Sequence, residues 1–187
     1  MKKTILLDVD EVLADTINPL LSIYNKKHHL AIKKQDLKTY ALHKNKGIEK
    51  DVYDIFYKPS FFRYLEVDKT AQLLVPKLQD LGYDIVFATA ILPPGYKDRH
   101  DWLLEHFPSV PYENFMFGTR KDLLKADFIL DDHLENLINS PCLHRFLMDR
   151  PWNQLTPPIE KYHGIKRVTS FEMFFNQIIA SQDKLVV

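Results

Sequence analysis

An apolar run that ends in two carboxylates constrains the fold of this chain more than any other feature. Residues 4–7 read Thr-Ile-Leu-Leu, and Asp8 and Asp10 follow with one residue between them. Such a short apolar run is typical of a strand buried in a parallel sheet. Ligands of open α/β sheets gather at the carboxyl ends of the strands. Asp8 is therefore predicted at that edge, and Asp10 points the same way because strand side chains alternate with period two.

Composition narrows the class of protein. The 187 residues suit one domain, or one domain with an insert. The formal net charge is zero, so bulk electrostatics give no reason to expect a nucleic acid polymer or a membrane as partner. No stretch approaches the roughly 18 apolar residues of a membrane span. A single cysteine, Cys142, suits a reducing compartment. Together these features predict a soluble cytoplasmic protein.

Strand and helix patterns alternate along most of the chain. Helical spacing of apolar residues predicts helices over 68–81, 97–107 and 171–179, and Gly82 is typical of the residue that ends a helix. Strands are predicted over 4–9, 83–88, 127–130, 145–148 and 165–168. This alternation favours an α/β fold, a doubly wound parallel sheet covered by helices on both faces.

The interval between the first strand and the helix at 68 is too long for a simple crossover. Its apolar clusters favour helices, and Pro59 and Ser60 are expected to mark its return to the sheet. We therefore predict a small helical cap over residues 16–64, inserted after the first strand. The core domain is predicted to comprise residues 1–15 and 65–187.

Three more segments place polar groups beside Asp8. Thr89 lies at the carboxyl end of the strand at 83–88, and its hydroxyl can donate to a phosphoryl oxygen. Lys121 opens a short helical stretch before the strand at 127–130, and its ammonium is a compact charge suited to phosphate. Asp131 and Asp132 follow that strand as a carboxylate pair, which a cation or hydrogen bonds must compensate. The pair could instead cap the next helix, but the ordered set favours a phosphate and metal site.

The ordered set resembles the four motifs of the haloacid dehalogenase (HAD) superfamily of phosphohydrolases. A closer likeness, to the 5′(3′)-deoxyribonucleotidase family, covers most of the chain including the cap. It is carried by residues 8–15 (DVDEVLAD), 61–66 (FFRYLE), 86–90 (VFATA) and 120–132 (RKDLLKADFILDD).

The resemblance implies a role for each motif. Asp8 attacks phosphorus and forms an aspartyl-phosphate, and Asp10 protonates the leaving oxygen and then activates water. Mg²⁺ binds the Asp8 carboxylate, the Asp10 backbone carbonyl and Asp132, with Asp131 binding directly or through water. Thr89 and Lys121 hold the phosphoryl oxygens. The implied substrate is a small phosphomonoester, specifically a nucleoside monophosphate, and homodimers occur in the family.

Several positions depart from the best-known animal members of that family. Glu11 replaces a glycine, Thr16 replaces an aromatic that packs on the base, and Ala90 replaces a serine that binds phosphate. The family's phosphate-binding arginine aligns with Thr119, and the neighbouring Arg120 is a candidate to substitute for it. These changes leave the reaction intact but put the preference for pyrimidine deoxynucleotides in doubt.

The resemblance also offers a candidate for the base pocket. Phe56 aligns with a family aromatic near the base, and it could equally belong to the core of the cap. Phe61 and Phe62 fit a core role better.

Three other functions compete with a nucleotidase. A HAD phosphatase for a different small phosphomonoester has the same motifs. A nucleotide-binding protein without turnover is favoured only by Glu11 and Ala90. A phospho-receiver module also uses acidic residues, a hydroxyl and a lysine, but it has its contiguous acid pair after the first strand and its acceptor aspartate later, the reverse of the order here.

Overall fold

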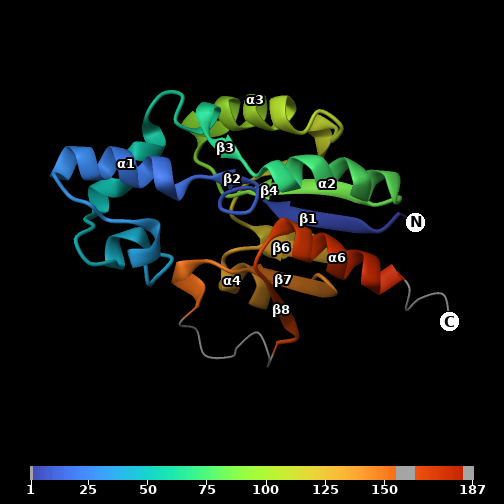
Figure 1. The fold of residues 1–187 in the computed structure, drawn as a ribbon. Coiled ribbons are helices and arrows are strands. Elements are labelled where there is room, and N and C mark those ends of the chain that lie inside the picture. The colour runs from blue at the N-terminus through green and yellow to red at the C-terminus, as the bar shows by residue number, and fades with distance from the viewer. Residues whose placement is uncertain (1, 155–162, 183–187) are drawn as a thin grey trace.

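A six-stranded parallel sheet forms the centre of the molecule, and the computed structural model describes residues 2–154 and 163–182. Its strand order is β5-β4-β1-β6-β7-β8 (Figure 1). Every neighbouring pair in that order runs parallel. The strands are β1 (Thr4–Asp8), β4 (Asp84–Thr89), β5 (Phe115–Phe117), β6 (Phe128–Asp131), β7 (His144–Met148) and β8 (Ile165–Val168).

The residues of β1 show how the sheet acquires two covered faces. Ile5 and Leu7 belong to the larger apolar cluster, whereas Leu6 belongs to a smaller cluster on the opposite face. The larger cluster includes side chains of α2, α3 and α6, and the smaller one includes side chains of α4. These helices are α2 (Lys69–Asp80), α3 (Tyr96–His106), α4 (Leu134–Ile138) and α6 (Phe171–Gln182).

Local signals fix the ends of α2. The Asp68 carboxylate accepts a hydrogen bond from the backbone N–H of Ala71 and caps the helix at its start. Beyond the other end, Gly82 has a φ of 89°, which residues with a Cβ rarely adopt. The chain then enters β4 beside β1.

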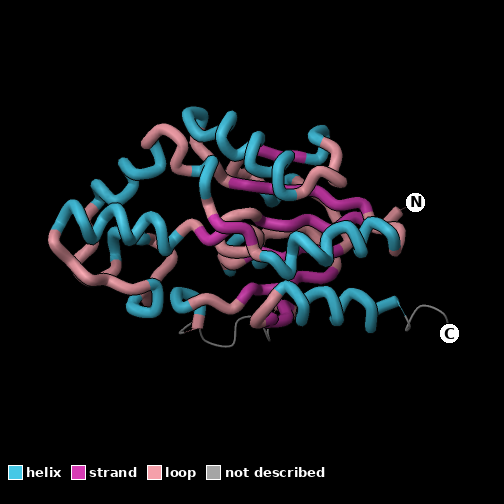
Figure 2. Tube along the Cα trace, turned by 45° about the horizontal axis from the view of Figure 1, so that its top comes forward, coloured by secondary structure: helices cyan, strands magenta, loops and turns pink. Residues whose placement is uncertain are grey.

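A short antiparallel ribbon connects the sheet to the rest of the chain. β2 (Ala14–Asp15) pairs with β3 (Glu66–Val67). The intervening segment contains α1 (Ile17–His28) and several 3₁₀ helices, and it lies beyond the end of β1 in both views (Figures 1 and 2). The 3₁₀ helices are Lys34–Asp36, Leu42–Lys44, Lys50–Tyr57 and Phe62–Tyr64.

The α/β class and the parallel sheet agree with the prediction. All five predicted strands are present within one residue at each end, and the three predicted helices are α2, α3 and α6. Three short strands, β2, β3 and β5, were not predicted. The boundaries of cap and core stay a prediction, and residues 155–162 and 183–187 of that core lie outside the described part. Within the described part, no helix combines the length and the apolar character that a bilayer span requires.

Candidate active site

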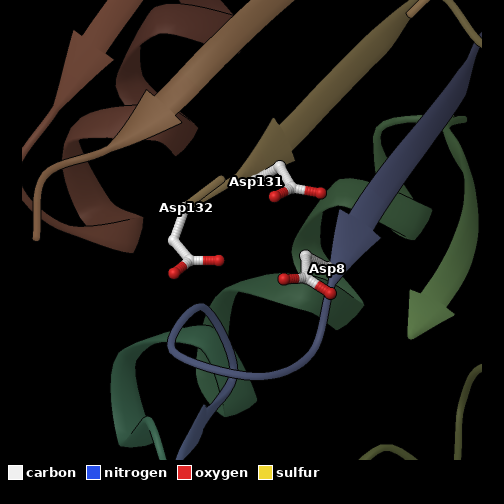
Figure 3. Close-up of side chains that lie close together, drawn as sticks. All are labelled: Asp8, Asp131 and Asp132. Carbon is white, nitrogen blue, oxygen red and sulfur yellow. The ribbon is translucent and has the colours of Figure 1, made fainter. Parts of the chain in front are cut away.

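Three carboxylates meet at the carboxyl edge of the sheet. Asp8 is the last residue of β1, Asp131 is the last residue of β6, and Asp132 follows it. Because β1 and β6 are parallel neighbours, their ends lie side by side and the three side chains converge (Figure 3). One oxygen from each carboxylate lies within 4.8 Å of the other two. The structure thus brings together three of the carboxylates that the sequence places at this edge, and their role in binding a metal stays a prediction.

Lys121 supplies the positive charge at the base of the cluster. It begins the 3₁₀ helix Lys121–Leu123, and its side chain is only 3 % exposed. Its Nζ lies 2.7 Å from Asp8 Oδ1 and 2.7 Å from Asp131 Oδ2. Burial alone would lower the pKa of Lys121, but the charges of Asp131 and Asp8 outweigh burial and raise that pKa. The ammonium is thus held charged against the two carboxylates.

One lysine does not balance three acids. Burial raises the pKa of Asp8 to about 7, against the lowering effect of Lys121 and with a further rise from Asp131. Burial also raises the pKa of Asp132 well above its ordinary value, and Asp8 and Asp131 add to the rise. The cluster is therefore short of positive charge.

The donor set fits a hard divalent cation. Carboxylate oxygens are the ligands that Mg²⁺ prefers, and one or two of them suffice beside water and phosphate. The two neighbouring acids differ in their availability. Both carboxylate oxygens of Asp131 already accept hydrogen bonds, which come from Lys121, Asn136 and the backbone N–H of His133. Within the described residues, the only hydrogen bond to the Asp132 carboxylate is at Oδ2, from Trp152 at 2.9 Å, so Asp132 has an oxygen available to a cation.

Asp10 is held by donors from three elements. Its Oδ1 accepts hydrogen bonds from Thr16 Oγ1 and from Arg99 Nη2, both at 2.5 Å. Its Oδ2 accepts one from Thr89 Oγ1 at 3.2 Å. Thr16 precedes α1, Arg99 lies in α3 and Thr89 ends β4. The carboxylate is therefore fixed in orientation beside the acid cluster.

Glu11 ties the loop after β1 to the start of α1. Its Oε1 accepts hydrogen bonds from the backbone N–H groups of Thr16 and Ile17 at 2.9 and 2.7 Å. Its Oε2 contacts the ammonium of Lys34, and its backbone carbonyl accepts from Arg150 Nε at 2.8 Å. Glu11 has a φ of 62°, a left-handed conformation that favours glycine. The buried carboxylate thus compensates for the departure from glycine by capping the helix, whose own first turn has no acid.

A cavity of about 320 Å³ opens onto the site. Asp10, Glu11 and Asp132 line its polar end, while aromatic and aliphatic side chains line the remainder. The aromatic ones come from the segment between β2 and β3 and from the loop after β7. They are Tyr40, Tyr53, Phe56, Phe62 and Trp152.

The remaining predicted residues divide into two groups. Phe56 and Ala90 line the cavity. Phe62 belongs to the buried core, as predicted, and also borders the cavity. Arg120 is not brought to the carboxylates, because its guanidinium is exposed and makes a two-pronged contact with Asp122. The Thr89 hydroxyl, predicted to face a phosphoryl oxygen, points to Asp10 in this structure.

Sequence reasoning did not place three side chains that lie at the site. Arg99 had a detectable signal, because it lies three residues before Trp102 on the apolar face of α3, where a charge demands a buried partner. Trp152 follows β7 at the same edge of the sheet, and this position could have indicated its role. Tyr40 stacks on His133 with ring centroids 3.7 Å apart. Its segment has no regular period, so the pattern held no signal for it.

The comparisons with known proteins agree with this geometry. The family model described as "5' nucleotidase, deoxy (Pyrimidine), cytosolic type C protein" matches residues 2–183. A Staphylococcus aureus (strain Mu50) protein, described provisionally as a 5'(3')-deoxyribonucleotidase, is 38 % identical over 140 residues, 73 % of this chain and 77 % of that protein. The 5'(3')-deoxyribonucleotidase of Bacillus subtilis (strain 168) is 29 % identical over 157 residues, 82 % of this chain and 89 % of that protein.

A solved structure shares the fold. It is a Burkholderia xenovorans LB400 protein, described provisionally as a haloacid dehalogenase-like hydrolase, with a TM-score of 0.58 and 11 % identity over 98 % of both chains. At that identity the likeness concerns the fold alone. The family match, by contrast, spans nearly the whole sequence. The chain therefore belongs to the family described as cytosolic type C 5′-nucleotidase, deoxy (pyrimidine), and is a phosphoric monoester hydrolase.

Proposed function

We propose that the protein is a cytoplasmic, Mg²⁺-dependent 5′(3′)-nucleotidase that hydrolyses nucleoside monophosphates, deoxynucleotides among them, through an aspartyl-phosphate. One observation carries the proposal. Asp8, at the end of β1, contacts Lys121 and lies beside Asp132, where an aromatic-lined cavity opens. A nucleophile, a phosphate-binding cation and a pocket for a flat ring are thus adjacent.

In the first step an Asp8 carboxylate oxygen attacks phosphorus. A phosphorus–oxygen bond forms to Asp8, and the bond from phosphorus to the nucleoside oxygen breaks. Asp10, in its protonated form, gives its proton to that oxygen, so the nucleoside leaves as a neutral alcohol. The hydrogen bonds that hold Asp10 set the direction from which the proton arrives.

In the second step water attacks the phosphorus of the aspartyl-phosphate. Asp10, now a carboxylate, removes a proton from that water, and the bond to Asp8 breaks. Inorganic phosphate leaves and the Asp8 carboxylate is restored. Asp10 regains its proton, so the cycle closes without another reactant.

Charge compensation is the main contribution of the surrounding groups. The Lys121 ammonium lies against the attacking carboxylate and neutralises charge that develops on the phosphoryl oxygens. Asp8, the Asp10 backbone carbonyl and Asp132 would hold Mg²⁺, with Asp131 close behind, and when bound the ion supplies further positive charge to the phosphoryl group. Asp131 keeps Lys121 in place through its 2.7 Å contact.

The shape and lining of the cavity support a nucleotide as substrate. A volume of about 320 Å³ lies at the lower end of the range for small-molecule sites. Aromatic rings such as Phe56 and Tyr53 offer flat faces on which a base can stack. Both bacterial relatives are named as deoxyribonucleotidases. No observation of comparable weight favours a different phosphomonoester.

Release of phosphate tests the proposal directly. Purified protein with Mg²⁺ is assayed on deoxy- and ribonucleoside 5′- and 3′-monophosphates, sugar phosphates and phosphoglycolate. We expect turnover of the nucleotides and its loss in Asp8→Asn. Asp80→Asn, an exposed acid at the end of α2, is the matched control and should keep full activity. Turnover retained in Asp8→Asn would refute the nucleophile, and a preference for sugar phosphates or phosphoglycolate would refute the substrate class.

A further inference from the structure

Arg99 is a buried charge that the reaction scheme has not used. Its side chain is fully buried in α3, and its Nη2 donates to Asp10 Oδ1. Its Nε and Nη1 have no hydrogen-bond partner among the residues that the structure describes. The guanidinium carbon lies 4.9 Å from the ring centroid of Phe62 and 5.6 Å from that of Trp102. The arginine is thus surrounded by aromatic rings, with one carboxylate as its charged contact.

This arrangement is unfavourable for folding when it is considered alone. Removing a guanidinium from water is expensive, and each buried N–H without an acceptor adds to the penalty. An apolar side chain of similar length at position 99 would fit the same aromatic surroundings without that penalty. The rings of Phe62 and Trp102 offset part of that penalty through cation–π contacts. The one group that needs an arginine's charge and N–H donor here is the Asp10 carboxylate.

That contact restricts the side chain of Asp10. The carboxylate is 28 % exposed and lines the cavity, so without donors it could rotate toward solvent. Arg99 and Thr16 both donate to Oδ1, one from the core helix α3 and one from the residue before α1. Within the described part of the chain, Oδ2 receives only the longer hydrogen bond from Thr89, which makes it the oxygen more available to a substrate.

We propose that Arg99 is a positioning residue that orients Asp10 for proton transfer to the leaving group, an inference that rests on the proposed function. In the proposed reaction Arg99 contacts neither the phosphate nor the base. It acts by fixing Oδ1, so that Oδ2 faces the ester oxygen that must be protonated. A misplacement of about 1 Å at a catalytic group lowers the rate by about 10²-fold, so a positioning error at Asp10 is measurable.

Leaving groups of graded basicity provide the test. The nucleoside oxygen must be protonated as it leaves because its anion is strongly basic, whereas 4-nitrophenolate departs as a stable anion. The value of kcat/KM reports the step in which the leaving group departs and excludes later hydrolysis of the aspartyl-phosphate. Arg99→Met is compared with wild type on a deoxynucleoside 5′-monophosphate and on a series from phenyl phosphate to 4-nitrophenyl phosphate. Lys97→Met, at an exposed position of the same helix, is the control.

We expect Arg99→Met to lose about 10²-fold in kcat/KM on the nucleotide and progressively less along the series, with 4-nitrophenyl phosphate nearly unaffected. Its thermal unfolding midpoint should equal or exceed that of wild type. Thr16→Val removes the other donor to Oδ1 and should show the same dependence on the leaving group, which keeps the test valid if Arg99→Met folds poorly.

Two failures are distinguishable. An equal loss on every substrate, with a lower unfolding midpoint, would overturn the positioning role and leave the proposed function standing. An inactive wild-type enzyme on all nucleotides would refute the proposed function itself, and the inference would fall with it.

Discussion

The two sides of the cavity differ in the side chains that form them: buried charged groups on one side and aromatic rings on the other. On the sheet side, Asp8, Lys121 and Asp131 are almost fully buried and contact one another through charged groups. On the side formed by the segment between β2 and β3, Tyr40 and Phe56 present rings from irregular loops and 3₁₀ helices. Tyr40 remains 48 % exposed. From this contrast we propose that the sheet side determines the chemistry and that the other side determines which molecule is admitted.

The largest expected effect is on the sheet side. Lys121→Gln removes the charge that faces the phosphoryl oxygens, and we expect kcat/KM to fall by about 10²–10³-fold. Lys125→Gln, at an exposed position four residues away, is the matched control and should leave kcat/KM unchanged. Steady-state phosphate release measures both. If the kcat/KM of Lys121→Gln stayed within about threefold of wild type, the proposed division between the two sides would be wrong. A single electrostatic donor to the transition state is expected to contribute much more than that.

A second prediction concerns Glu11, which connects the two sides. In Glu11→Gln the amide keeps an acceptor for the N–H groups of α1 but loses the charge facing Lys34. We expect the free energy of unfolding to fall by about 1.5–3 kcal/mol, the range for hydrogen bonds to charged groups.

Denaturant unfolding of Glu11→Gln, Lys34→Met and the double variant isolates the pair. The double variant should be little less stable than either single variant. Strictly additive losses would mean that the contact of Glu11 with Lys34 stabilises nothing.

Phe56→Ala tests the side that admits substrate. Loss of a ring on which a base stacks is worth about 1–3 kcal/mol, so we expect KM for a deoxynucleotide to rise by about 5- to 150-fold. The kcat/KM for deoxyribose 5-phosphate, which has no base, should barely change. Parallel assays of the two substrates decide the point, and an equal loss on both would assign Phe56 to packing instead of substrate selection.

The smallest effect is on stability in Mg²⁺. In the metal-free protein the folded-state pKa values of Asp8, about 7, and of Asp132 lie above the ordinary value of 3.8. The folded state therefore binds more protons than the unfolded chain, and this contribution to stability is lost as pH rises from about 4 to about 7. A cation competes with those protons, so the Mg²⁺-induced rise in Tm should be larger at about pH 8 than at about pH 5.

Thermal scans with and without Mg²⁺ at the two pH values measure the rise in Tm. Each kcal/mol of stabilisation by the ion should raise Tm by about 2–4 °C in a chain of this length. The variant Asp132→Asn should reduce the rise. If the Mg²⁺-induced rise in Tm did not depend on pH, the cation would not be binding to these carboxylates.

The sheet side was predictable because strand ends carry a strong signal. An apolar run followed by Asp8, and another followed by Asp131 and Asp132, indicate both the fold and the edge at which the acids meet. Lys121 lies against Asp8 in the structure, and its predicted contact with phosphate stays a prediction. The strand β5 was missed because its three residues are too short to show a period.

The opposite side was harder to predict for a physical reason. Tyr53 lies in a 3₁₀ helix and Tyr40 in an irregular segment, and neither has a 3.6-residue repeat that could indicate which side chains face a cavity. Arg120 was a plausible phosphate ligand by position, but a neighbouring acid, Asp122, holds its guanidinium at the surface. The contact of Arg99 with Asp10 joins residues 89 apart and needed the folded chain to be recognised.

The ribbon of β2 and β3 has a consequence for the segment between them. Ala14 pairs with Val67 and Asp15 with Glu66, so the chain departs from the core and rejoins it at hydrogen-bonded neighbours. The segment between β2 and β3 therefore begins and ends at adjacent points. Because the entropy of closing a loop grows only slowly with its length, a longer or shorter segment at this place costs little stability. The insert can therefore change in length and in the rings it presents to the cavity at little cost to the sheet, provided that Thr16, its donor to Asp10, is kept.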